Sequence, residues 1–72
     1  MNERLYAAQL RSAVSAKEGE IKMSEMHRDL LQEDDAPQRA ELDILIADGY
    51  AELDRLRASL AASEARIAAG AR

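Results

Sequence analysis

Three consecutive carboxylates, Glu33, Asp34 and Asp35, form the densest cluster of reactive side chains in the sequence and stand just before Pro37, the only proline. Two carboxylates catalyse hydrolysis when unlike environments separate their pKa values. Neighbours on one solvated turn share an environment, so we interpret this cluster as capping and solubilising groups. Two alternatives are a docking surface for a basic protein, with Glu41 as a fourth member, and a divalent-cation site.

The other candidate residues lack catalytic partners. His27 is the only histidine, which excludes a two-histidine metal site. We expect it to lie at the margin between two helices, with a pH-sensitive role as the alternative. The serines have no base positioned by spacing, and the three glycines are isolated, so no phosphate-binding loop is present. We therefore expect no enzymatic activity and no cofactor or metal.

The composition favours long helices that need a partner. The chain has 72 residues, no cysteine, no tryptophan and no phenylalanine, and it is rich in Ala, Leu, Glu and Arg. Such a short chain rarely buries enough apolar surface alone, and disulfides are excluded. Oligomerisation is the remaining way to stabilise it.

Charge and hydropathy exclude other classes of partner. The net charge is −4, which argues against direct binding to nucleic acid or to an anionic membrane surface. No run approaches the roughly 18 apolar residues that would span a bilayer. The N-terminal residues contain no continuous apolar stretch, so we expect no signal peptide and a cytoplasmic location. Met1 favours a complete small protein.

The second half of the sequence has a regular heptad pattern. Its seam positions alternate in steps of four and three: Leu42, Ile46, Gly49, Leu53, Leu56, Leu60, Ser63 and Ile67. We predict a helix over about residues 36–69, started by a capping box from Asp35 to Gln38. A small seam residue such as Gly49 either leaves a hole or receives a large side chain from the facing helix.

The first half, about residues 3–33, has apolar residues on two opposite sides of a predicted helix. One side carries Ala7, Leu10, Val14, Ile21 and Leu31, and the other carries Ala16, Gly19, Met23, Met26 and Leu30. A helix that is apolar on two sides is usually buried on two sides, here against its own partner helix and against another chain. A break at Gly19 is the alternative. We favour one continuous helix, because an interior glycine costs only about 0.5–1 kcal/mol.

These patterns predict an all-α fold, an antiparallel two-helix hairpin of coiled-coil type with its turn at 34–36. Residues whose numbers add up to about 70 then lie side by side. Gly19 falls near Gly49, which allows either a close helix approach or filling of the space by Met23. We expect the hairpin to dimerise into a four-helix bundle. The self-association seam comprises Leu10, Val14, Ile21, Met23, Met26, Leu30, Leu42, Ile46, Leu53, Leu56, Leu60 and Ile67.

The charges are segregated along this hairpin. Residues 29–54 contain nine acidic residues and one basic residue, Arg39, whereas the remainder of the chain is net basic. The turn is therefore the acidic tip of a rod with a basic open end. In an antiparallel dimer each tip would lie beside the basic end of the other chain.

Three functions fit these features. The first is a non-enzymatic interaction module that self-associates. The second is an inhibitor, antitoxin or regulator whose tip, with Glu33, Asp34, Asp35 and Glu41, enters a basic groove of a larger protein. The third is a scaffold subunit of a phage or secretion assembly.

For the second function there is a resemblance in the turn Asp34-Asp35-Ala36-Pro37. The acidic hairpin resembles the coiled-coil domain of bacterial factors that enter the secondary channel of RNA polymerase. This resemblance implies that Asp34 and Asp35 have a functional role at the tip. The resemblance covers the hairpin and its turn only, since the sequence lacks the cysteine zinc finger or globular domain of those factors.

Overall fold

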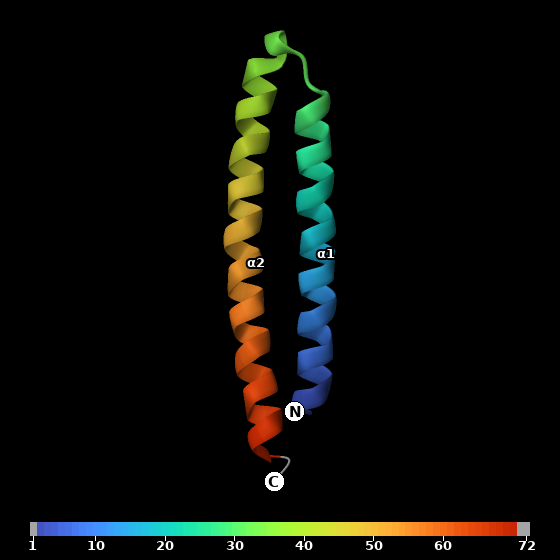
Figure 1. Cartoon of the computed structure of the whole chain (residues 1–72), viewed down its shortest axis with the longest axis vertical. Helices are drawn as coiled ribbons and strands as arrows, with labels where there is room; N and C mark the ends of the chain where they lie inside the picture. The colour runs from blue at the N-terminus through green and yellow to red at the C-terminus, as the bar shows by residue number, and fades with distance from the viewer. Residues whose placement is uncertain (1, 71–72) are drawn as a thin grey trace.

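The chain forms an antiparallel pair of long helices joined at one end (Figure 1). A computed structural model describes residues 2–70. Helix α1 spans Glu3–Leu30, the short 3-10 helix η1 spans Glu33–Asp35, and helix α2 spans Ala36–Gly70. The rod measures 59 × 16 × 14 Å. The prediction of an all-helical, two-helix hairpin is confirmed.

Helix α1 begins with a side-chain cap and runs without interruption. The Asn2 side chain accepts hydrogen bonds from the backbone N–H groups of Arg4 (3.0 Å) and Leu5 (3.4 Å), which would otherwise lack partners. The helix continues through Gly19, so the alternative of a break there is excluded. Neither helix, over residues 2–70, contains a segment long and apolar enough to cross a bilayer.

The connection between the helices differs from the prediction. Helix α1 ends at Leu30 rather than near residue 33, because Leu31 adopts an extended backbone (φ −73°, ψ 146°). Glu33 consequently lies in η1, which leads directly into α2. The predicted capping box from Asp35 to Gln38 is wrong: the Asp35 carboxylate accepts a hydrogen bond from the backbone N–H of Gln32 (2.9 Å) and closes the preceding turn.

The two helices meet along one seam of buried side chains, which we call the inner seam. Helix α1 contributes Ala7, Leu10 and Ile21, and α2 contributes Leu42, Ile46, Gly49, Leu53 and Ser63. Val14 packs against this core. Leu56, Leu60 and Ile67 continue the seam as half-buried residues. The heptad prediction for α2 is thus confirmed.

At Gly49 the Ile21 side chain of α1 packs directly against the backbone of α2. A Cβ atom at this position would lie 2.8 Å from Cγ1 of Ile21, so the Ile21 side chain fills the space that the missing side chain leaves. Gly19 faces away: a Cβ atom there would meet nothing within 4 Å. The prediction that Gly19 and Gly49 face each other, or that Met23 fills the gap, is therefore wrong. The helical period carries Gly19 to the side of α1 opposite α2.

Candidate interaction surfaces

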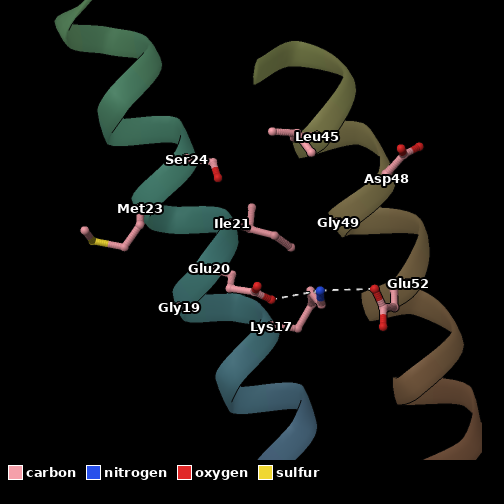
Figure 2. Close-up of a pocket in the computed structure, with 10 residues that line it drawn as sticks. All are labelled: Lys17, Gly19, Glu20, Ile21, Met23, Ser24, Leu45, Asp48, Gly49 and Glu52. Carbon is pink, nitrogen blue, oxygen red and sulfur yellow. Dashed lines mark ion pairs between the residues drawn. The ribbon is translucent and has the colours of Figure 1, made fainter. Parts of the chain in front are cut away.

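The side of α1 that faces away from α2 is an exposed apolar stripe, which we call the outer stripe: Ala16, Gly19, Met23, Met26 and Leu30. Met23, Met26 and Leu30 are 66%, 52% and 77% exposed. In Figure 2 the Met23 side chain points away from α2, whereas Ile21 points toward it. The structure thus divides the predicted self-association seam. Nine of its residues pack within the hairpin, and these three large side chains do not.

A shallow groove runs beside the outer stripe between the two helices (Figure 2). Lys17 crosses it, with its ammonium group 2.8 Å from the Glu20 carboxylate and 3.0 Å from that of Glu52. Hydrogen bonds to Glu20 and then to Glu52 raise the pKa of Lys17, so the amine stays charged. The groove therefore contains a neutralised lysine rather than a free nucleophile.

Leu45 extends the apolar surface onto α2. It lines the same groove and is 59% exposed. The heptad pattern did not predict a role for Leu45 or for Ile44, which is 63% exposed. Leu45 directly precedes the seam residue Ile46, and this position could have revealed it as a flanking residue. Large apolar residues outside the seam are the signal that was missed.

Polar contacts across the inner seam hold the helices in register. Ion pairs join Arg57 to Glu18 (3.0 Å) and Arg28 to Asp43 (3.1 Å). The Tyr50 hydroxyl donates to the Glu25 carboxylate (3.1 Å), and this hydrogen bond raises the pKa of Tyr50. Each of these exposed contacts contributes little stability. Their positions agree with the prediction that facing residues have numbers that add up to about 70.

At the open end, Glu3 joins the helices. Its carboxylate accepts hydrogen bonds from Arg66 Nε (2.7 Å) and from the hydroxyl of Ser63 (2.6 Å), a fully buried residue. These bonds, first from Arg66 and then from Ser63, lower the pKa of Glu3. Ser63 thus has a carboxylate partner but is inaccessible to a substrate, so the contact is structural.

At the other end, the predicted tip residues do not all have the same role. Glu33, Asp34 and Glu41 are exposed, and in the described part of the chain none of them makes an ion pair. Asp35 is half-buried and is occupied by the backbone of Gln32. Of the four predicted tip residues, three therefore present unpaired carboxylates to solvent.

Arg39 fixes the shape of this tip. Its guanidinium donates to the backbone carbonyl of Leu31 (2.9 Å) and reaches that of Gln32 (3.5 Å). It therefore satisfies carbonyls beyond the end of α1 instead of neutralising the acidic residues. This role of Arg39 was not predicted, although its position as the only basic residue among nine acidic ones in residues 29–54 was a signal.

Neither surface has the features of a metal centre. Over residues 2–70, no three His, Cys, Asp or Glu side chains are placed together so that they could hold a metal ion. His27 is exposed on α1, next to Met26. The arrangement offers two kinds of chemistry, apolar association along the outer stripe and electrostatic contact at the tip.

Comparison of the chain with models of protein families, with curated proteins and with solved structures finds no match in any of the three.

Proposed function

We propose that this protein is a protein–protein interaction module that associates with a second copy of itself through the outer stripe of α1. The observation that carries the proposal is the exposure of Met23, Met26 and Leu30 on one helix side at heptad spacing. Contiguous apolar patches on a protein surface commonly mark interaction sites. Methionine is frequent at such surfaces because its side chain is flexible.

The small core of the hairpin supports this proposal. Only six hydrophobic residues are buried in the described part of the chain, and the sequence has no cysteine for a disulfide. Chains of this size usually need a further source of stability, and oligomerisation is one. A dimer would draw that stability from apolar surface that the single hairpin leaves in water.

The expected free energy is favourable but modest. Six large side chains, three from each copy, would contribute on the order of 10 kcal/mol if fully buried. Association costs about 4–15 kcal/mol in lost translational and rotational freedom. We therefore expect a reversible dimer rather than a permanent one, so its population depends on protein concentration.

The position of the outer stripe decides the layout of the four helices. Because the stripe lies opposite α2, two copies joined through it place both α1 helices in the centre and both α2 helices outside. The assembly has four helices, arranged more nearly in a row than in a square bundle. We place it in the cytoplasm, a location that rests on the sequence alone.

A pair of matched substitutions tests this function. Leu30→Glu places a charge in the outer stripe, whereas Ile44→Glu places the same charge on a comparably exposed apolar residue of α2. Light scattering should give the mass of a dimer for the unmodified chain and for Ile44→Glu, and the mass of a monomer for Leu30→Glu. A Leu30→Glu chain that dimerises as strongly as the Ile44→Glu chain contradicts the proposal.

A second candidate function uses the tip. Glu33, Asp34 and Glu41 have no ion-pair partner in the described residues, and Arg39 binds backbone carbonyls of the turn instead of these carboxylates. A tip whose carboxylates are not neutralised suits a basic groove on a larger protein, because complementary charge speeds association and fixes orientation.

The tip function requires variants that leave Asp35 intact, since that side chain shapes the turn. Glu33→Gln combined with Asp34→Asn removes two charges and keeps both side-chain sizes. Affinity capture with this variant should lose any partner that the unmodified chain retains, while circular dichroism remains unchanged. A partner retained equally by both chains does not bind through the tip.

A further inference from the structure

Charged residues flank the outer stripe in a pattern that can select one dimer arrangement. Lys22 and Asp29 precede Met23 and Leu30 on one flank, seven residues apart. Both are exposed, and neither takes part in an ion pair in the described part of the chain. Their charges are therefore available to a second copy.

The opposite flank has a second pair at the same spacing, of which Glu20 already contacts Lys17 within the hairpin. Glu20 and His27 follow Gly19 and Met26, also seven residues apart and also exposed. In heptad terms, Ala16, Met23 and Leu30 share one seam position, and Gly19 and Met26 share the other. Each flank thus presents an acidic residue and either a basic residue or a histidine at equivalent positions one heptad apart.

We propose that two copies pair through their α1 helices in antiparallel orientation, with Met23 against Met26 of the second copy and Leu30 against Gly19 of the second copy. This inference rests on the self-association proposed above and adds its orientation and register. In an antiparallel helix pair, each flank meets the same flank of the other helix. Lys22 then lies beside Asp29 of the second copy, and Glu20 beside His27 of the second copy.

The shapes of the side chains fit the same register. Leu30 is the most exposed large hydrophobic residue of the described chain, and Gly19 has open space where a side chain would stand. Leu30 of each copy can therefore lie over Gly19 of the other, as Ile21 lies over Gly49 within the hairpin. A small residue opposite a large one brings two helices together without a clash.

Other arrangements place like charges together. A shift by one heptad in one direction brings Lys22 beside Lys22 and Glu20 beside Glu20 of the second copy. A shift in the other direction brings Asp29 beside Asp29. A parallel pair separates Lys22 from Asp29 of the second copy and brings the two acidic tips together. Like charges in contact are disfavoured, so charge selects the register while apolar burial supplies the affinity.

Engineered cysteines test this arrangement directly, because the native chain contains none. An equimolar mixture of Gly19→Cys and Leu30→Cys chains, reduced, mixed and then oxidised, should form the mixed disulfide. Each chain alone should not link to itself, because the two equivalent thiols are offset by about 16 Å along the axis, well beyond disulfide reach. Ala62→Cys, at an exposed residue of α2 outside the outer stripe, measures random collision.

The outcomes separate the register from the function. Efficient self-linking of Leu30→Cys alone indicates a parallel pair and overturns the proposal, as does a mixture that links no faster than Ala62→Cys. The mass of each variant in reducing buffer is measured in parallel. The mass of the unmodified chain, which keeps Gly19 and Leu30, is measured at the same concentration: a monomer there contradicts the self-association itself, whereas a dimer of the unmodified chain with the wrong linkage in the variants contradicts only the register.

Charge reversal gives a second test that adds no thiol. Lys22→Asp alone and Asp29→Lys alone each place like charges at two symmetric contacts and should weaken the dimer about tenfold. The double variant restores unlike pairs and should recover the affinity. A double variant as weak as the single variants overturns the proposed pairing.

Discussion

The two sides of α1 are both apolar, yet only one of them is covered. Leu10 and Ile21 on the inner seam are almost completely buried by α2, whereas Met23 and Leu30 on the outer stripe are mostly exposed. The difference is one of position on the helix, since all four side chains are large and apolar. A single partner helix can cover only one side, so the apolar surface that remains is the part of the molecule open to association.

The two central glycines show the same difference at the level of single atoms. Gly49 is buried and receives Ile21 from the facing helix, while Gly19 faces open space. Glycine is unfavourable inside a helix at both positions. At Gly49 the close helix contact offsets that cost, whereas at Gly19 no contact within the hairpin does. We expect the second copy to supply it.

The largest difference between the two sides should appear when a large side chain is removed. Ile21→Ala deletes core contacts above Gly49 and should destabilise the hairpin by about 2–4 kcal/mol. Met23→Ala should change the stability of the monomer by less than about 0.5 kcal/mol, because the side chain is exposed. Urea unfolding followed by circular dichroism, at concentrations too low for association, measures both. An equal decrease in the free energy of unfolding for both variants would contradict the distinction between the inner seam and the outer stripe.

The glycines should respond in opposite directions to the same substitution. Gly19→Ala adds a methyl group in open space and should stabilise the helix by about 0.5–1 kcal/mol. Gly49→Ala forces Ile21 or a helix to move and should destabilise by about 1–3 kcal/mol, partly offset by the same gain in helix propensity. Thermal unfolding of the two variants at low concentration compares them. A Gly49→Ala chain as stable as Gly19→Ala would show that the helices can separate without cost.

The smallest effect concerns Glu3, a polar member of the inner side of α1. Because hydrogen bonds from Arg66 and Ser63 lower its pKa, the charged carboxylate stabilises the folded state above the ordinary pKa of glutamate. That contribution is lost as the pH falls through the lowered pKa. We expect the stability difference between the unmodified chain and Glu3→Gln to be present at neutral pH and to disappear as the pH falls below the ordinary pKa of glutamate and through the lowered pKa of Glu3. A difference that is independent of pH would show that Glu3 acts without its charge.

Local pattern was sufficient to predict most of this fold. The heptads of α2 predicted its buried residues, the small cost of an interior glycine predicted that α1 continues through Gly19, and the doubled apolar pattern of α1 predicted the outer stripe. The turn was harder, because α1 ends where Arg39, eight residues beyond Leu31, meets the backbone carbonyls. Contacts between segments that no local period relates are not visible in a helix pattern. The same limit explains the wrong prediction for Gly19. Residue numbers predict how far along the hairpin Gly19 lies, near Gly49, but not that it faces away from α2.

The two candidate surfaces were also predicted only in part. The outer stripe was identified from its spacing, and its role in self-association stays a prediction. The carboxylates of the tip were identified from their density, but Asp35 turned out to shape the turn rather than face solvent. Sequence alone did not separate a charge that is free from one that holds the backbone.

Sedimentation equilibrium of the unmodified chain over a range of concentrations tests most directly whether the outer stripe joins two copies. We predict a reversible rise from the mass of one chain to the mass of two as the concentration increases to about 100 μM. The mass of a single chain throughout that range would contradict self-association.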